Sequence, residues 1–180
     1  MSIQLKEMLQ KILVPGVFGE INERTAILKE SDLSAKLREV QIKGVSDDSI
    51  LIKIDYCHTN DQIFCNKNGS LKRCDYLLIT KLRRKKFLLF LEMKSNRFTG
   101  TEVVQKFRAS ECFFDYIISI LKQFHDHDFN YEEYKKRFVL FQIKPLPKRP
   151  VHSQRTGSAP DNYLSKNYDP NKPPTLESLS

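Results

Sequence analysis

Apolar residues are most concentrated in the middle of the chain, at residues 74–94. Two runs rich in Leu, Ile and Phe flank a short polar segment there. This pattern predicts a β-hairpin that is buried on both faces. A turn at residues 82–85 would pair Lys81 with Lys86 and Thr80 with Phe87.

The same pairing, continued at a constant sum of residue numbers, sets Asp75 opposite Glu92. Directly opposed side chains share a face, with Cβ atoms about 5 Å apart. Because side chains alternate along a strand, Lys94 lies on that face as well. The pattern therefore predicts three ionisable side chains at one end of a buried hairpin.

Helical spacing of apolar residues predicts a short helix at residues 3–13 and a second at 19–30. Residues 31–43 fit either a capped helix or a strand, and both alternatives stay open. Residues 50–57 alternate as a half-buried strand. Asp55, near its end, would face solvent or, as the alternative, be a further metal ligand.

The second half of the chain predicts a long helix, capped near Thr99 and ending near Phe124, and then a buried strand at residues 135–144. The core order is helix, three strands, helix, strand. This order indicates an α/β fold with a mixed sheet and helices on both faces. We expect the long helix to form a right-handed crossover between two parallel strands.

The arrangement of Asp75, Glu92 and Lys94 resembles that of the PD-(D/E)xK nuclease superfamily, which has the restriction-endonuclease-like fold. Cys74 stands where that motif has proline, and Met93 is the variable residue between Glu92 and Lys94. The resemblance covers residues 19–144. It implies a three-layer core in which Asp75 and Glu92 hold a metal and Lys94 is catalytic.

The metal that suits two carboxylates with open positions is Mg²⁺ or Mn²⁺. It would polarise a phosphodiester oxygen and activate a water that Lys94 orients. The resemblance also implies a further metal ligand on the helix before the sheet, Glu23 or the alternative Glu20. It suggests that Gln105, on the long helix, is a further catalytic residue. The four cysteines have no disulfide-framework spacing, so we expect reduced thiols. The alternative is a zinc site formed by Cys57, His58, Cys65 and Cys74.

Residues 145–180 hold most of the prolines and few aliphatic residues, so they predict a Pro-rich tail outside the nuclease-like domain at residues 1–144. This tail is either disordered or an extended strap that docks on a partner or on its own domain. Its anchors would be Tyr163, Leu164, Tyr168 and Leu176. By analogy, a small nuclease without a recognition module would take its target from a larger partner, such as an ATPase in a genome-defence or repair complex.

The formal net charge of +8 suits a polyanionic partner, DNA in preference to RNA. Lys106 and Arg108 follow Lys94 closely in sequence and are the expected phosphate contacts, whereas the basic turn at residues 81–86 lies about 20 Å from the acids. No signal peptide or membrane-spanning apolar run is visible, so we expect a cytoplasmic protein without a membrane partner.

These observations predict a metal-dependent nuclease that acts on DNA as a subunit of a larger complex. The alternative is a catalytically inactive adaptor or nucleic-acid-binding subunit that keeps the nuclease fold.

Overall fold

The structure is a computed structural model that describes residues 3–32, 34–56, 67–95, 98–127, 129–143 and 155–180. Its centre is a five-stranded mixed sheet in the order β4-β5-β6-β7-β8. The β4–β5 and β5–β6 pairs are antiparallel, and the β6–β7 and β7–β8 pairs are parallel. The strands are β4 (Ile50–Lys53), β5 (Tyr76–Leu82), β6 (Lys85–Lys94), β7 (Tyr134–Gln142) and β8 (Leu164–Asn167).

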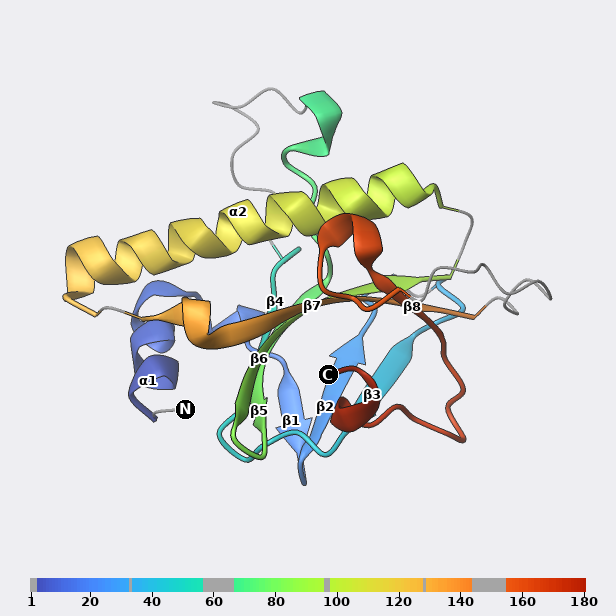
Figure 1. Cartoon of the computed structure of the whole chain (residues 1–180), viewed down its shortest axis with the longest axis horizontal. Coiled ribbons are helices and arrows are strands. Elements are labelled where there is room, and N and C mark those ends of the chain that lie inside the picture. Colours follow the sequence, from blue (N-terminus) through green and yellow to red (C-terminus); the bar gives the residue numbers. More distant parts are fainter. Residues whose placement is uncertain (1–2, 33, 57–66, 96–97, 128, 144–154) are drawn as a thin grey trace.

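Two α-helices pack on one face of this sheet, α1 (Ile3–Ile12) and α2 (Gly100–His125) (Figure 1). Both lie where helical spacing predicts them. The α2 helix begins as expected at Thr99, whose Oγ1 accepts a hydrogen bond of 3.1 Å from the Glu102 N–H. It connects β6 to the parallel strand β7. In the described part of the chain, no helix is long and apolar enough to span a membrane.

A second, three-stranded antiparallel sheet covers the other face, so the expectation of helices on both faces is wrong (Figure 1). It consists of β1 (Glu20–Asn22), β2 (Thr25–Lys29) and β3 (Glu39–Lys43). Five short 3₁₀ helices complete the described chain: η1 (Pro15–Val17), η2 (Lys67–Gly69), η3 (Tyr131–Glu133), η4 (Pro160–Asn162) and η5 (Leu176–Ser178).

The helix expected at residues 19–30 is instead the β1–β2 hairpin. Asn22 pairs with Thr25, which leaves a two-residue turn at Glu23 and Arg24. Both turn residues have positive φ, 46° and 61°, as a tight hairpin turn of the primed type requires. Buried side chains alternate along β2 with a period of two. The buried ones, Ala26 and Leu28, pack against the large sheet. For residues 31–43 the structure selects the strand alternative, β3, and residues 50–53 are buried on both faces rather than half-buried.

The central hairpin has the predicted register, with Lys81 opposite Lys86 and Thr80 opposite Phe87. Its turn is shorter than expected, because Leu82 and Lys85 still pair. Side chains of β5 and β6 alternate between the two apolar cores, one beneath the helices and one beneath the small sheet. Both faces of the hairpin are therefore covered. Charged side chains at its end lie close to these apolar cores.

Residues 155–180 pack on their own domain. This is the alternative in which the C-terminal segment docks on the domain itself. It supplies β8 as an edge strand of the large sheet. Tyr163 contacts Phe107 on α2, with ring centroids 5.8 Å apart. The Tyr168 hydroxyl accepts a hydrogen bond from the Gln41 N–H, and Leu176 is fully buried beneath the small sheet. Residues 155–180 are thus part of the folded core and not a tail beside it.

Candidate active site

Asp75 and Glu92 lie at the same end of the large sheet, one before β5 and the other near the end of β6. The Ile54 N–H donates to the carbonyl oxygen of Asp75, and Asp75 Oδ2 accepts a hydrogen bond of 2.6 Å from the Met93 N–H. This bond ties the Asp75 carboxylate to the strand that carries Glu92. Asp75 is 8% exposed and Glu92 is 0% exposed, so two carboxylates are held at the edge of the core.

Two lysines converge on Glu92. Lys94 Nζ lies 3.0 Å from Glu92 Oε1, as expected for neighbours on one face of β6. Lys106, from α2, donates to the same oxygen at 2.7 Å and lies 3.6 Å from Asp75 Oδ1. Lys94 also contacts Glu102 at 3.2 Å, which completes a network of alternating charges.

The second carboxylate oxygen of Glu92, Oε2, is buried and has no hydrogen-bond partner in the described part of the chain. An acceptor in this position costs free energy unless a donor or a cation satisfies it. Within the described residues, no three His, Cys, Asp or Glu side chains gather closely enough to hold a metal ion. Two carboxylates are nevertheless enough for Mg²⁺, which keeps several of its waters. Asp75 and Glu92 therefore fit a hydrated divalent cation.

Asp55 was expected to face solvent, and this expectation is wrong. Its Oδ1 is buried and has no hydrogen-bond partner among the described residues. Burial and the nearby charge of Asp75 raise the pKa of Asp55 to about 6. Asp55 lies just after β4, the neighbour of β5, so the end of the sheet collects a third carboxyl group.

The electrostatics of the cluster follow from burial and mutual charge. Burial and the charge of Glu92 raise the pKa of Asp75, although Lys106 opposes the shift. Burial alone would lower the pKa of Lys106, but Asp75 and Glu92 outweigh it and hold that pKa above its usual value. Lys106 therefore stays charged beside the two carboxylates.

Neither Glu20 nor Glu23 lies on a helix that points into this cluster. Glu20 is on β1 and forms an exposed ion pair with Lys29. Glu23 is in the β1–β2 turn, next to Arg24, which bonds to the backbone of Val45. That turn lies at the end of the sheet where β4 begins, opposite the end that carries Asp75, so the structure does not bring Glu23 to the expected metal site.

Gln105 and Arg108 lie on α2, and their described contacts are with other residues than the carboxylates. Gln105 packs so closely against Gly69 that a Cβ added to this glycine would come within 2.6 Å of Gln105 Oε1. Arg108 is exposed and lies 3.8 Å from Asp161 of η4. The structure therefore gives neither residue a described contact with Asp75, Glu92 or Lys94.

Lys106 was expected to contact phosphates from the surface, but its side chain is only 18% exposed and points into the cluster. Ser110 explains this placement. Its hydroxyl donates to the Lys106 carbonyl and accepts from the Cys74 N–H at 2.8 Å, which fastens α2 to the residue before Asp75. The position of Lys106 one turn before Ser110, on the face of α2 that includes Val103 and Phe107, is the sequence signal that pointed inward.

Three of the zinc candidates, Cys57, His58 and Cys65, lie outside the described residues, and Cys74 is buried in the core beneath the helices.

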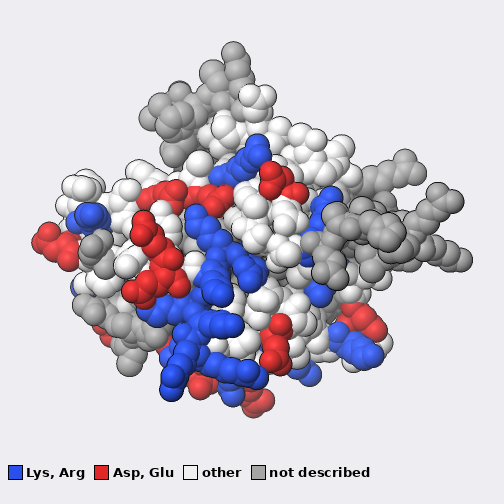
Figure 2. Space-filling model, viewed as in Figure 1, with Lys and Arg blue, Asp and Glu red and all other residues white. Residues whose placement is uncertain are grey.

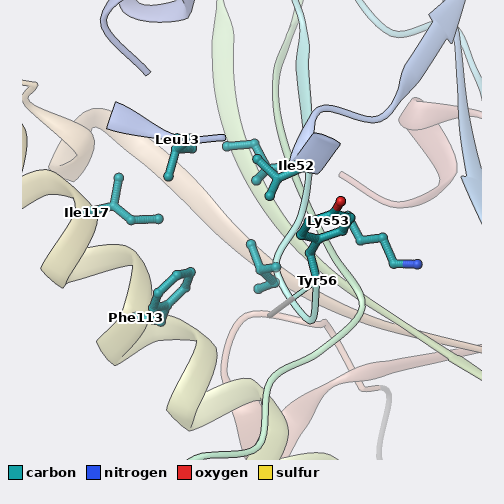
Figure 3. A pocket seen from close by; sticks show the side chains of 8 residues that line it. Leu13, Ile52, Lys53, Tyr56, Phe113 and Ile117 are labelled. Carbon is teal, nitrogen blue, oxygen red and sulfur yellow. The ribbon is translucent and has the colours of Figure 1, made fainter. Parts of the chain in front are cut away.

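An apolar pocket of about 60 Å³ lies between η1, β4 and α2 (Figure 3). Leu13, Ile52, Phe113 and Ile117 surround it, and the ammonium of Lys53 points away from it. Sites for organic ligands occupy about 300–1,000 Å³, so this pocket is too small for such a ligand. Its mainly apolar lining fits a gap in side-chain packing.

Comparison with protein-family models, with curated proteins and with solved structures gives no match to this chain.

Proposed function

We propose that this protein is a metal-dependent phosphodiesterase of the PD-(D/E)xK type that cleaves DNA. The observation that carries the proposal is the buried Glu92, with one oxygen bound by two lysines and the other without a partner among the described residues, beside the buried Asp75. The order of the three antiparallel strands β4, β5 and β6, then α2 and the parallel strand β7 supports it, although the helix expected before these strands is the β1–β2 hairpin.

Asp75 and Glu92 are the residues that would hold Mg²⁺ or Mn²⁺. The ion, when bound, polarises a phosphodiester oxygen and lowers the pKa of a coordinated water. Glu92 Oε2 and the acceptor Asp75 Oδ1 are hard oxygen ligands of the kind these ions prefer.

Lys94 is the catalytic lysine of the proposal. Its ammonium lies 3.0 Å from Glu92 and its side chain is 19% exposed, so it reaches both the carboxylate and incoming water. From there it orients the attacking water and stabilises the charge that develops on the phosphate. Asp55 adds negative charge next to Asp75 and increases the attraction of the site for a divalent cation.

We also propose that the nuclease is a subunit of a larger complex, with a partner such as an ATPase. The expected anchors of that partner, Tyr163 and Leu176, are buried in the domain itself. The other two expected anchors, Leu164 and Tyr168, are half-buried, so a partner would bind without Tyr163 and Leu176.

The test is cleavage of a labelled DNA duplex by the purified protein in Mn²⁺, Mg²⁺ or EDTA. We expect cleavage with either metal and none in EDTA. Glu92→Gln and Lys94→Ala should each remove it while the circular dichroism spectrum stays unchanged, whereas Arg108→Ala should retain it. Wild-type rates in either of the first two variants would exclude the proposed roles.

One observation favours the alternative, a catalytically inactive adaptor with the nuclease fold. Lys106 already supplies a positive charge within 4 Å of both carboxylates, so the cluster is partly neutralised without a metal. The adaptor proposal predicts DNA binding that is the same in EDTA and Mn²⁺, with no cleavage in either.

A further inference from the structure

Five cationic side chains surround a hollow of about 480 Å³ at the turn of the central hairpin. Glu177 is the carboxylate among the lining residues. Figure 2 shows this concentration of Lys and Arg between β7 and the β5–β6 turn. The cations are Arg83, Arg84, Lys85, Lys135 and Arg137.

The charges in this hollow are not balanced by the fold. Arg83 contacts Glu177 at 3.3 Å, but both side chains are largely exposed, at 82% and 69%. Arg84, Lys85 and Lys135 have no ion pair in the part of the chain that the structure describes. The hollow therefore carries an excess of positive charge that a ligand can neutralise.

The other face of the same strands is different. Lys86 pairs with Glu133, and Lys136 pairs with Glu111 at 2.9 Å. A neighbouring hollow of about 520 Å³ carries less excess charge, since two aspartates line it and Lys81 contacts one of them, Asp48, at 2.9 Å. Arg84, Lys85, Lys135 and Arg137 thus lie together without a carboxylate partner among the described residues, whereas the lysines on the other face of these strands are paired.

Arg137 is the anchored member of the group. Its guanidinium lies 5.8 Å from the centroid of the Phe87 ring, and its Nη1 donates to the Lys136 carbonyl. The Nε is buried and has no hydrogen-bond partner among the described residues. Arginine in this setting presents a planar fork that matches phosphate oxygens.

The hollow offers charge but no surface for stacking, because Phe87, the aromatic residue that lines it, is only 2% exposed. A nucleobase or another aromatic group would find no exposed ring to stack on there. The charged residues also come from the turn and from two strands, so they form an extended surface. Charge without stacking favours the sugar–phosphate backbone of a nucleic acid over a single nucleotide.

We propose that this hollow is a second nucleic-acid contact, which binds the phosphodiester backbone of DNA at a distance from the carboxylate cluster. It rests on the proposed function and names where the substrate is held. Lys85 and Glu92 are seven residues apart on β6, about 23 Å at 3.3 Å per residue. Because seven is odd, the two side chains also point to opposite faces of the strand, Lys85 to the side of the small sheet and Glu92 to the side of the helices. A nucleic acid that contacts both must therefore extend past the end of the sheet, so the hollow holds backbone far from the cleaved bond. This reverses the expectation that Lys106 and Arg108 provide the main phosphate contacts and the turn matters less.

The test is binding of a labelled 30-base-pair duplex in EDTA, measured by fluorescence anisotropy at several salt concentrations. Lys85→Ala/Lys135→Ala removes two cations of the hollow. The matched control, Lys86→Ala/Lys136→Ala, removes the same two charges from the opposite face of the same strands. We expect the first pair to weaken binding and to reduce the magnitude of the salt slope by about 2, and the control to change it little.

Equal losses in the two pairs would show that only net charge matters and would overturn the proposal, as would no loss in the first pair. Displacement of the duplex by pyrophosphate at equal phosphate concentration would also overturn it, because the ligand would then be a small polyphosphate. The proposed function fails separately. Wild-type protein that binds through the hollow but never cleaves in Mn²⁺ would reject the nuclease and keep the contact.

Discussion

Lys106 on α2 donates a hydrogen bond of 2.7 Å to Glu92, a carboxylate with no exposed surface. The helix thus supplies the charge that allows an acid to lie buried at the end of the sheet. Burial of an ionised carboxylate without such a partner is strongly unfavourable. This contact therefore links the stability of the fold to the chemistry of the site.

Lys106→Ala should destabilise the protein by about 3 kcal/mol, because it leaves Glu92 and Asp75 without their shared cation. Urea unfolding in EDTA measures this. Arg108→Ala, on the same helix but exposed, should cost less than about 1 kcal/mol. Mn²⁺ should raise the unfolding midpoint of Lys106→Ala more than that of the wild type, since the ion replaces the lost charge. Equal effects of the two substitutions would contradict this role of Lys106.

Asp55 should make the protein less stable as the pH rises from about 4 to about 6. Its pKa in the folded state is about 6, above the usual 3.8, so the folded state holds the proton more tightly than the unfolded state. The stability that this proton provides is present below pH 4 and is lost as the pH passes 6. In EDTA, Asp55→Asn should flatten the decline in thermal midpoint between these pH values. Parallel curves for the two proteins would show that Asp55 does not titrate in this range.

Leu176→Ala should destabilise the protein by about 2–5 kcal/mol, because this side chain is fully buried beneath the small sheet. Lys172→Ala, on the surface of the same segment, should change the unfolding free energy by less than about 0.5 kcal/mol. Chemical denaturation of the full chain provides both values. A Leu176 variant as stable as the wild type would mean that residues 155–180 do not belong to the cooperative unit.

The central hairpin was predictable from sequence because its pairing is local. The short polar segment between two apolar runs fixed the register, and the period of two then placed Asp75, Glu92 and Lys94 on one face. The cap at Thr99 identified the start of α2 by the same kind of local rule.

The β1–β2 hairpin was not predictable in this way. Ile21, Thr25 and Leu28 are spaced as on a helix, yet Ala26 and Leu28 also alternate as on a strand. Packing against the large sheet selects the strand. Apolar residues on the face away from the helices bury themselves against Ala26 and Leu28, and these residues are distant in sequence. Propensity is a weak guide where tertiary packing selects the element.

The roles of Lys106 and Asp55 also depend on distant packing. Lys106 reaches Glu92 only because Ser110 fastens α2 to Cys74 at a fixed rotation. One oxygen of Asp55 becomes buried because β4 pairs with β5 next to Asp75. The helical spacing places Lys106 on the buried face of α2, but the contact with Glu92 and the burial of the Asp55 oxygen both depend on residues distant in sequence.

The most direct test of the central claim is the binding of Mn²⁺ to the wild type, Asp75→Asn, Glu92→Gln and Lys94→Ala, measured by isothermal titration calorimetry. We predict one ion bound to the wild type and to Lys94→Ala, because Lys94 orients water and does not ligate the ion. Binding should fall at least tenfold, by roughly 1.4 kcal/mol or more, in the two carboxylate variants. The same affinity in all four proteins, or none in the wild type, would contradict a metal centre at Asp75 and Glu92.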